Sequence, residues 1–383
     1  MTRLHEALGG IADEAPLVDL ADRAIAGHRR RRRTTLALAT AAAATATAVI
    51  AMIGMVTTTV ALPGPRGDET AAQQRADGVQ RADAVPDLPG GRVGVLSHAY
   101  RTPCEVDQED PLRPPDCSAV EWRVVTGTGA TYRVPQALVS TAKGWRAPVA
   151  ISRDGRMLAY YSRQAQAHVV RDLVSGSEVV SPVTVKEERI GGGSMLAVSD
   201  DGRYVVFDPR EGTKDPGLLI DMRTGRKLSV NGKFEVVSVK DGVAALVRYV
   251  KTDLWLMPVT GGGSPVRFDG VFIMFSELAP DGRTVAAFDF RAKGREKRTL
   301  SILDARSGRI LRRVAIHGLP KGGGVSGVAT WRSGSEVTIV YDGEEVSTYA
   351  VDVRTGKARR LAGYPGTLTN PTDPVLPGVA AIG

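Results

Sequence analysis

The chain has 383 residues, with 50 Lys and Arg against 42 Asp and Glu and a formal net charge of +8. The basic residues are interleaved with acidic ones outside the block Arg29, Arg30, Arg31, Arg32 and Arg33, so the charge gives no reason to expect a nucleic-acid partner. Two cysteines exclude a cysteine-rich zinc module, and 43 Gly and 22 Pro between short β-rich runs confine predicted helix mainly to about the first sixty residues.

Residues 1–33 are predicted to form a basic, amphipathic cytoplasmic tail. Apolar residues recur at near-helical spacing among acidic ones, and Pro16 divides the pattern into two short helices. One interpretation is a solvated tail. The other is a docking segment for a cytoplasmic protein, because such short helices need a groove to bury their apolar face.

Residues 34–62 carry no charged side chain and are predicted to form a transmembrane α-helix. This run of 29 residues exceeds the ~20 that span a bilayer, and it ends at Pro63. The five preceding arginines hold that end in the cytoplasm by the positive-inside rule, so the rest of the chain is expected outside. A cleavable signal of twin-arginine type is the main alternative, but the run is long and lacks a clear Ala-x-Ala site. A buried helix of a soluble domain is the weaker alternative.

The tail, the arginine block and the Ala/Thr-rich run resemble the start of actinobacterial membrane proteins associated with extracytoplasmic-function sigma factors. This resemblance covers about forty residues and implies a cytoplasmic regulator as the partner of residues 1–33. Residues 63–91 have almost no large apolar side chain and are predicted to be a flexible tether, which would hold the next domain roughly 30 Å from the membrane. The expected location is the cell membrane, with a single pass through the lipid bilayer.

From residue 92 onward the chain repeats a turn motif every forty to fifty residues or so. The motif is a small residue, an Asp-Gly turn and Arg, followed by an apolar strand. It occurs as Ser152 to Arg156, Ser199 to Arg203 and Ala279 to Arg283, and in reduced form as Ser238 to Gly242 and Trp331 to Ser335. Asp-Gly between two β runs predicts a tight hairpin, since glycine accepts a positive φ.

A second motif follows about twenty residues after each first turn. It is a strand that ends in Asp, then two residues, then Ser or Thr and Gly. The full copies are Asp172 to Gly176, Asp221 to Gly225, Asp304 to Gly308 and Asp352 to Gly356. Each copy predicts another hairpin, with the Asp side chain bonded to nearby backbone amides rather than acting in an acid/base pair.

Two hairpins per repeat make four strands, the size of a β-propeller blade. The repeats predict an all-β fold over residues 92–383, a six-bladed β-propeller of four-stranded blades that follows the transmembrane α-helix. The expected blades are 92–144, 145–190, 191–232, 233–270, 271–322 and 323–363. Both turns resemble those of TolB-like and WD-repeat-like propellers, over about 270 residues. This resemblance implies the architecture and leaves the function open, because propellers host many activities.

Blade one lacks a good inner strand, and the apolar segment Val375 to Ile382 is predicted to supply it and close the ring. In the same blade, Cys104 and Cys117 flank an acidic, proline-rich insertion. Because thiols oxidise outside the membrane, we expect a structural disulfide worth about 3 kcal/mol. A redox-active pair is the alternative, although the spacing is not Cys-x-x-Cys.

The sequence contains no Gly-x-Ser-x-Gly pentapeptide, and the glycine triplets that begin at Gly191, Gly261 and Gly322 do not form a Walker loop. Of the five histidines, only His98, His168 and His317 lie in the expected propeller, scattered over three blades, so neither a metal site nor a cofactor is expected. We therefore expect a binding or sensing module that is not an enzyme. The alternative is a secreted hydrolase or lyase with an active site in the central channel.

Strand alternation places the loops between second and third strands on the face that also carries the connections between blades. Several of these loops are basic, and the candidate ligand-face residues are Lys214, Arg248, Lys251, Arg291, Lys293, Arg295, Lys297 and Arg298. Glu344 and Glu345 occupy the same loop of blade six. An ordinary solvated rim is one interpretation. The sharper hypothesis is an extracytoplasmic partner that is anionic, such as a cell-wall polymer or lipid headgroups, with an unknown protein as the other class.

Overall fold

The computed structural model describes residues 85–107, 110, 113–210, 215–249, 251–290, 298–364 and 374–382. The predicted tail with its five arginines, the predicted transmembrane helix and most of the predicted tether lie outside these residues. Within the described ranges, no helix has the length and apolar character needed to cross a membrane.

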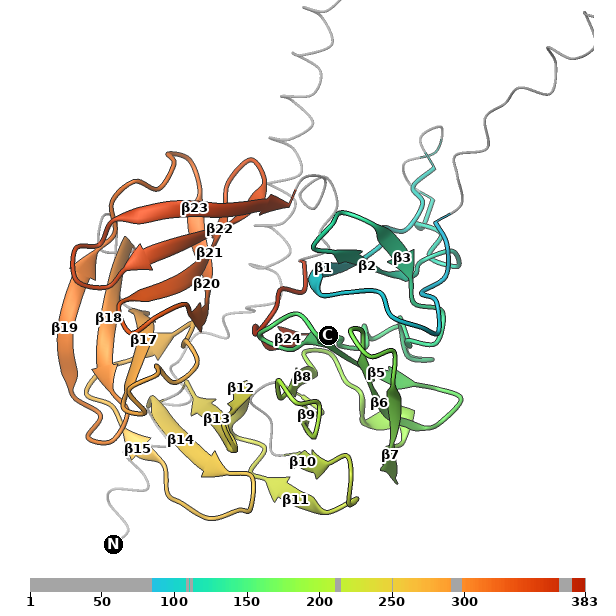
Figure 1. Cartoon of the computed structure of the whole chain (residues 1–383), viewed down its shortest axis with the longest axis horizontal. Coiled ribbons are helices and arrows are strands. Elements are labelled where there is room, and N and C mark those ends of the chain that lie inside the picture. The colour runs from blue at the N-terminus through green and yellow to red at the C-terminus, as the bar shows by residue number, and fades with distance from the viewer. Residues whose placement is uncertain are drawn as a thin grey trace, which may run out of the picture. The chain divides into compact units, whose positions relative to one another are not determined.

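Six β-sheets surround a common axis and form the predicted six-bladed β-propeller (Figure 1). Blade one contains β1 (Leu96–Arg101), β2 (Trp122–Thr126) and β3 (Thr131–Arg133). Blade two contains β4 (Ala150–Ile151), β5 (Met157–Ser162), β6 (Ala167–Asp172) and β7 (Glu178–Thr184). Blade three contains β8 (Met195–Val198), β9 (Tyr204–Asp208), β10 (Gly217–Asp221) and β11 (Lys227–Val230). A short 3-10 helix, η2 (Glu187–Arg189), connects blades two and three.

The other three blades are four-stranded antiparallel sheets. Blade four contains β12 (Glu235–Lys240), β13 (Val243–Arg248), β14 (Asp253–Pro258) and β15 (Val266–Arg267). Blade five contains β16 (Phe272–Ile273), β17 (Thr284–Asp289), β18 (Thr299–Asp304) and β19 (Ile310–Ala315). Blade six contains β20 (Gly324–Trp331), β21 (Glu336–Asp342), β22 (Val346–Asp352) and β23 (Ala358–Tyr364). Each blade falls within its predicted span, except that β23 ends one residue later.

The first repeated turn is held by its own side chains. In blade two, the Ser152 hydroxyl donates to Asp154 at 2.6 Å and accepts the Met157 N–H at 2.8 Å. Gly155 between them has a φ of +76°, a conformation that favours glycine. The copy in blade three repeats the pattern, with the Ser199 hydroxyl donating to the Asp of its own turn at 2.6 Å. The motif therefore forms and stabilises a hairpin, as predicted.

In three blades, the arginine of the first turn binds the aspartate of the second. The ion pairs are Arg156 with Asp172 at 2.5 Å, Arg203 with Asp221 at 2.8 Å and Arg283 with Asp304 at 2.5 Å. The strand register causes this, because the residue after each arginine pairs with that aspartate across the two middle strands. Blade four has Val243 and Met257 at the two positions. Blade four therefore lacks both the arginine and the aspartate of this ion pair.

These aspartates also accept backbone hydrogen bonds from their own turns, as predicted. Asp304 accepts the N–H groups of Arg306 at 2.9 Å and Ser307 at 3.3 Å. The Arg283 guanidinium and these turn amides hold the pKa of the Asp304 carboxyl well below its usual range. The aspartates thus join the two hairpins of a blade, which the sequence motifs alone did not reveal.

The glycine that ends the second turn lies against the outer strand of the preceding blade. A Cβ at Gly308 would lie 1.9 Å from the carbonyl oxygen of Arg267 in β15. A Cβ at Gly356 would lie equally close, 1.9 Å, to the carbonyl oxygen of Ala315 in β19. Both glycines also have positive φ, +73° and +75°. Only glycine fits there, because the opposing atoms are backbone and cannot move aside.

The hydrophobic core lies between neighbouring blades rather than within them. One cluster packs Tyr161 of blade two against Leu196 and Phe207 of blade three. Another packs Ile302 of blade five against Ile339 of blade six. Most strands therefore bury both faces, and the stability of each blade depends on its neighbours.

The C-terminal segment, residues 374–382, runs on the inner side of the ring from blade one to blade three (Figure 1). Val375 exchanges both backbone hydrogen bonds with Ala99 of β1, at 2.8 and 2.9 Å. The Gly378 N–H then donates to the Ile151 carbonyl of blade two at 3.0 Å. The segment ends as β24 (Ala381–Ile382), which pairs with β8 of blade three.

The predicted contact with blade one is therefore confirmed at Val375, but the prediction of an added inner strand there is wrong. Blade one has three strands, and the segment extends the sheet of blade three instead. Pro374 and Pro377 flank the single contact with β1. Because proline has no N–H to donate, they do not continue the pairing with β1.

Candidate ligand-binding site

The two ends of the propeller axis differ. Both repeated turns of each blade lie at one end, which we call the turn face. The loops between second and third strands, together with the connections between blades, lie at the other end, which we call the loop face. Antiparallel alternation fixes this division, since every second connection returns to the same end.

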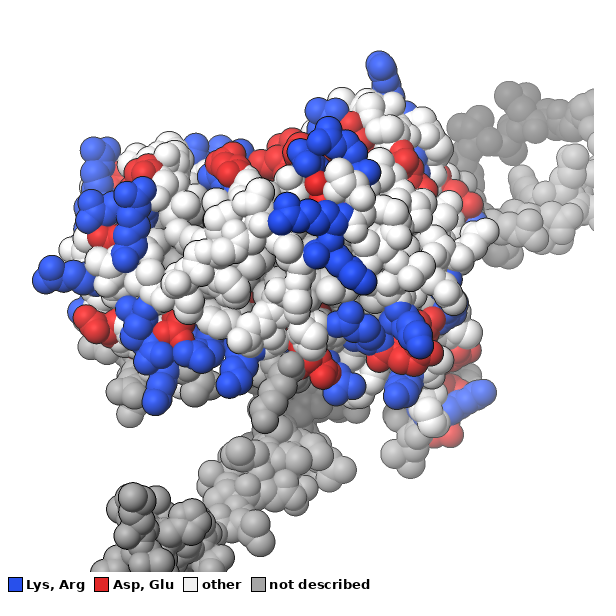
Figure 2. All heavy atoms as spheres, turned by 90° about the horizontal axis from the view of Figure 1, so that it is seen from below, with Lys and Arg blue, Asp and Glu red and all other residues white. Residues whose placement is uncertain are grey.

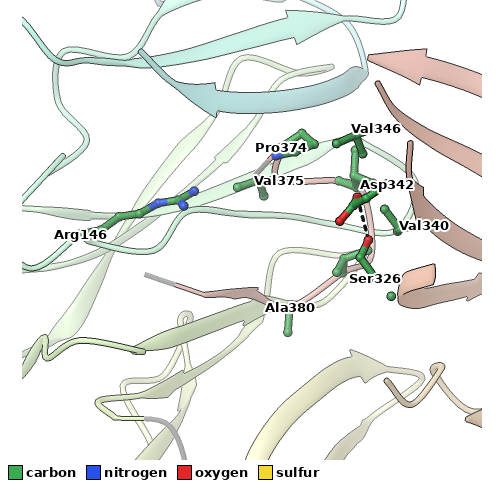
Figure 3. A pocket seen from close by; sticks show the side chains of 11 residues that line it. Arg146, Ser326, Val340, Asp342, Val346, Pro374, Val375 and Ala380 are labelled. Carbon is green, nitrogen blue, oxygen red and sulfur yellow. Dashed lines mark hydrogen bonds between the residues drawn. The ribbon is translucent and has the colours of Figure 1, made fainter. Parts of the chain in front are cut away.

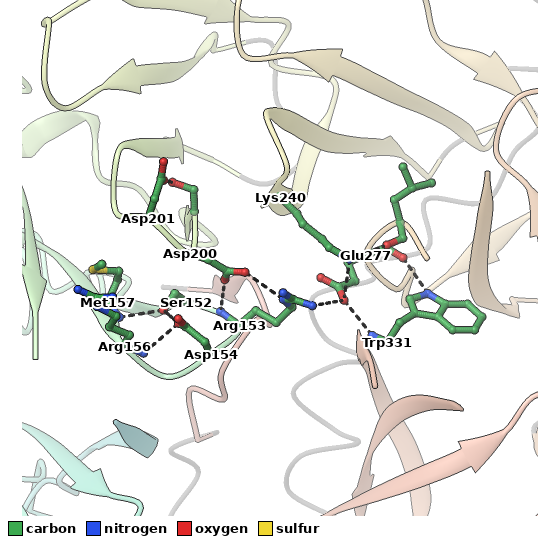
Figure 4. Close-up of polar contacts among 12 residues, drawn as sticks. Ser152, Arg153, Asp154, Arg156, Met157, Asp200, Asp201, Lys240, Glu277 and Trp331 are labelled. Carbon is green, nitrogen blue, oxygen red and sulfur yellow. Dashed lines mark hydrogen bonds and ion pairs between the residues drawn. The ribbon is translucent and has the colours of Figure 1, made fainter. Parts of the chain in front are cut away.

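At the turn face, four charged side chains from four blades meet beside the axis (Figure 4). Arg153 follows β4 and donates from its backbone N–H and its Nε to Asp200, which follows β8, at 3.0 Å each. The Nζ of Lys240, which ends β12, lies 3.5 Å from Oε1 of Glu277, which follows β16. Arg153 Nη1 lies 4.0 Å from the same oxygen. We call these four residues the axial cluster.

Blade six joins the axial cluster through Trp331, whose backbone N–H donates to Glu277 Oε1 at 2.9 Å. The Glu277 side chain is 2% exposed, and burial raises its pKa. The pKa of Glu277 is lowered in turn by Lys240, the Trp331 amide and Arg153. Because each charge faces a partner from another blade, the axial cluster ties blades two to six together at the turn face.

The three described histidines lie away from the axial cluster. His168 is enclosed by Tyr161 and Phe207, and its ring nitrogens have no hydrogen-bond partner among the described residues. Burial lowers the pKa of His168 to about 3 and that of His98, on β1, to about 4. His317 lies after β19. The turn-face end of the axis thus has carboxylates, but these histidines do not accompany them.

The predicted basic residues of the loop face fall into two groups. Lys214, Arg291, Lys293, Arg295 and Lys297 lie outside the described residues, in loops whose flanking strands end at the loop face.

Arg248, Lys251 and Arg298 are described. Arg248 binds Asp253 of β14, and Arg298 donates from Nη2 to the Pro320 carbonyl at 2.8 Å. Both therefore support the fold. Lys251 is exposed in the turn between β13 and β14, where its φ is +61°.

Large apolar side chains are also exposed at the loop face. Val106 is 53% exposed in the loop after β1, Trp145 48% before β4 and Phe290 64% after β17. Seen edge-on, the propeller has Lys and Arg mixed with Asp and Glu along both edges (Figure 2). Charge is therefore not segregated by sign over the part of the surface in view. The two faces differ in the side chains of individual loops rather than in the sign of their overall charge.

The predicted disulfide is confirmed. Cys104 and Cys117 are bonded, with their Cα atoms 4.3 Å apart. Glu105 and Asp116, just inside the bridge, exchange backbone hydrogen bonds at 2.7 and 2.8 Å. The disulfide therefore closes the loop between β1 and β2 at the loop face.

A cavity of about 450 Å³ lies on the axis. Its walls come from β8, β12, β20, the segment around β16 and the C-terminal segment. Met195 and Glu235 begin inner strands at the loop-face end, whereas Glu277 lies at the other end. We call this space the axial cavity.

A smaller hollow of about 210 Å³ lies beside the axial cavity (Figure 3). The Ser326 hydroxyl donates to Asp342 Oδ1 at 3.0 Å on one side of it. Arg146 extends toward it from the opposite side, and Val375 and Ala380 of the C-terminal segment form part of its wall. The C-terminal segment thus contributes to both spaces.

Among the residues that the structure describes, no set of three or more His, Cys, Asp or Glu side chains is arranged to hold a metal ion. No protein-family model matches the chain, and no curated protein matches it.

Similarity to solved structures extends only to the fold. The chain is similar to the dihydro-heme d1 dehydrogenase NirN in complex with DHE, at 17% identity and a TM-score of 0.38, over 73% of this chain and 57% of that one. It is also similar to the β-propeller domain of Myceliophteria thermophila Cps50 (Swd1), at 15% identity and a TM-score of 0.38, over 61% and 76%. A nidogen/laminin complex gives 10% identity and a TM-score of 0.41, over 70% and 92%. The chain therefore spans little more than half of NirN.

Sequence reasoning missed the axial cluster, although a signal was present. The residue just before the Asp of the first turn is Arg153, Asp200 and Lys240 in three successive blades. Opposite charges alternate at this variable position, which lies at the inner end of each blade. Because every blade directs that position toward the axis, the alternation encodes contacts between blades.

Proposed function

We propose that the chain is a membrane-anchored, extracytoplasmic binding module whose loop face recognises an anionic partner. The observation that carries the extracytoplasmic location is the Cys104–Cys117 disulfide, because disulfides persist in oxidising compartments. Support for the anchor is the charge-free run 34–62 directly after the arginine block.

The ligand face rests on two features of the loop face. Its loops include the basic residue Lys214 in blade three and the basic run Arg291 to Arg298 in blade five. In the corresponding loop of blade four, Lys251 is exposed. The exposed Trp145 and Phe290 add apolar contact surface at the same end. A polyanion that crosses several blades would contact several of these loops at once, which favours a cell-wall polymer as the partner.

The test uses the full-length chain, poly(glycerol phosphate) and vesicles that contain phosphatidylglycerol. Changing Arg291, Lys293, Arg295 and Lys297 to Gln removes four charges from the loop face and spares Arg298, which supports the fold. The matched control changes four exposed turn-face residues to Gln: Arg223, Arg309, Arg354 and Lys357.

Polymer binding should weaken with added salt and be lost in the loop-face variant alone. Binding that salt and both variants leave unchanged would reject the anionic partner. Binding to vesicles but not to the polymer would identify lipid headgroups as the partner instead.

The signalling part of the proposal concerns residues 1–33. Their amphipathic pattern suits a cytoplasmic docking segment, and their resemblance to proteins associated with sigma factors suggests the partner. The full-length chain should capture a sigma factor from the cytoplasm of the same cell, whereas a chain lacking residues 1–28 should not. Equal capture by both chains would reject a role for the tail.

A second candidate is a secreted hydrolase or lyase with its active site on the axis. The observation in its favour is Glu277, a buried carboxyl with a raised pKa, because a general acid needs such a pKa. Turnover of p-nitrophenyl esters or glycosides, lost in Glu277→Gln, would favour this candidate. Turnover that survives the substitution would reject Glu277 as the acid.

A further inference from the structure

The wall of the axial cavity is mainly apolar. Its side chains include Met195 of β8, Val236 and Val237 of β12, Ile273 of β16, Phe275, and Val328 of β20. These side chains come from four successive blades, three to six, and meet at the axis. Water in an apolar space makes few hydrogen bonds, so an apolar molecule that replaces it gains free energy.

The axial cavity offers little charge to a ligand. Among the described residues that line it there is neither Lys nor Arg, so an anion would find no opposite charge. Glu277 is bound by Lys240 and by the Trp331 amide, and Glu235 also has a partner within the protein. Both carboxyl groups are therefore already engaged, and the affinity for a ligand has to come from the apolar wall.

Two aromatic rings and two methionines give this wall its character. Tyr249 and Phe275 both line the axial cavity, with ring centroids 6.4 Å apart at an angle of 48°. Aromatic rings present a large apolar contact area. The side chains of Met195 and Met274 are flexible and polarisable, so they adapt to ligands of different shape. Together these groups suit a ligand with an alkyl or aryl body.

The inner strands are irregular where they face the axial cavity. In β12, Val237 is an extra residue opposite β13, which makes a β-bulge, and Ser326 is an extra residue of β20 opposite β21. Met274, directly after β16, has a φ of +55°, which is unfavourable for a residue with a Cβ. All three residues line the axial cavity, whereas the inner strands β4 and β8 pair regularly. Bulges and strained residues persist where the surrounding structure fixes them, and they are common beside ligand sites.

We propose that the axial cavity binds a small neutral molecule, whose alkyl or aryl body packs against Val237, Met274 and Phe275. The volume of about 450 Å³ lies within the usual range for small-molecule sites, ~300–1,000 Å³, and is too small for a polymer. This ligand differs in chemistry and in place from the anionic partner of the loop face, so the inference goes beyond that proposal.

The test is photolabelling of the full-length chain in cell membranes with 3-azioctanol. This neutral alcohol carries a diazirine ring, which loses N₂ on illumination and inserts into a side chain in contact with it. Mass spectrometry should locate the label on the peptides that contain Val237 or Met274 and Phe275. Butan-1-ol, hexan-1-ol and octan-1-ol should compete, and the half-blocking concentration should fall about fourfold for each added methylene. Octanoate should require at least about tenfold more than octan-1-ol, because no cation receives its carboxylate.

A cavity-filling variant tests the position of the ligand. Val237→Phe should reduce the label about tenfold, because the larger side chain occupies part of the axial cavity. Val180→Phe is the matched control, because Val180 is 49% exposed on the outer strand β7, and this chain should be labelled like the unaltered one. The thermal midpoints show whether both chains are folded. Competition by the alcohols needs no variant, so it decides the question even if Val237→Phe unfolds the chain.

Three results would overturn the proposal: octanoate that competes as well as octan-1-ol, a folded Val237→Phe chain that keeps the label, or label confined to peptides that do not line the axial cavity. The loop-face variant defined above separates the two proposals, because it should lose the polymer and keep the label. Absence of polymer binding in every chain would reject the anionic partner alone. Loss of the label in the loop-face variant would place the neutral ligand at the loops and contradict the axial site.

Discussion

Replacement of Gly308 by alanine should separate blades four and five. Gly308 has a φ of +73°, and a Cβ there would lie 1.9 Å from the carbonyl oxygen of Arg267. The positive φ costs roughly 1–2 kcal/mol for a residue with a Cβ. Relief of the clash adds about 1–3 kcal/mol, because the opposing atom is backbone and the two blades must move apart. The expected loss of unfolding free energy is therefore about 3 kcal/mol.

Gly282→Ala provides the matched control. Gly282 has a similar φ of +64°, but no atom lies within 4 Å of its Cβ position, so only the conformational cost of roughly 1–2 kcal/mol applies. For a domain of this size, the thermal midpoint should fall by roughly 5–10 °C for Gly308→Ala and by about 2–4 °C for Gly282→Ala. Calorimetry of both full-length variants measures this difference. Equal midpoints would refute the argument that the second-turn glycine is required by contact between blades.

Three further predictions concern other parts of the propeller. His168 has its pKa lowered from 6.5 to about 3, so the stability it contributes as a neutral ring is complete above pH 6.5 and is lost as the pH falls toward 3. His168→Phe should flatten the dependence of the urea midpoint on pH between about 6.5 and 4.5, and parallel curves would contradict this. Changing Cys104 and Cys117 to Ser should lower the unfolding free energy by about 3 kcal/mol, and unchanged urea unfolding would contradict that value. A chain ending at Tyr364 loses Val375 and Leu376, each 4% exposed, and should lose about 4 kcal/mol; an unchanged thermal midpoint would show that the C-terminal segment does not stabilise the ring.

The sequence predicted the fold because each turn motif is stabilised by hydrogen bonds between residues that are close in sequence. Ser152 and Asp154 bond to atoms within five residues of each other, so their spacing alone reports the hairpin. Repetition then fixed the number of blades. The course of the C-terminal segment was mispredicted, because apolar character does not show which inner strand a segment joins. Pro374 and Pro377, which limit its pairing with β1, were the informative residues.

The candidate sites were harder to predict because they depend on contacts between blades. Arg153 and Asp200 are 47 residues apart, and the contact between them follows from the closed ring rather than from any motif. Glu235 and Tyr249 likewise share a wall only because β12 lies at the axis. Arg248 and Arg298 were predicted as ligand residues from charge alone. In the structure Arg248 is paired with Asp253 and Arg298 donates to a carbonyl group, contacts that charge alone does not predict.

The central claim is that a propeller outside the cell is held by residues 34–62. Treating intact cells with a membrane-impermeant amine-reactive label, followed by fractionation, tests it most directly. The account predicts an uncleaved chain in the membrane fraction, resistant to carbonate washing, with label on propeller lysines such as Lys227 and Lys357, both of which are exposed. An unlabelled, full-length chain in the cytosol would contradict it.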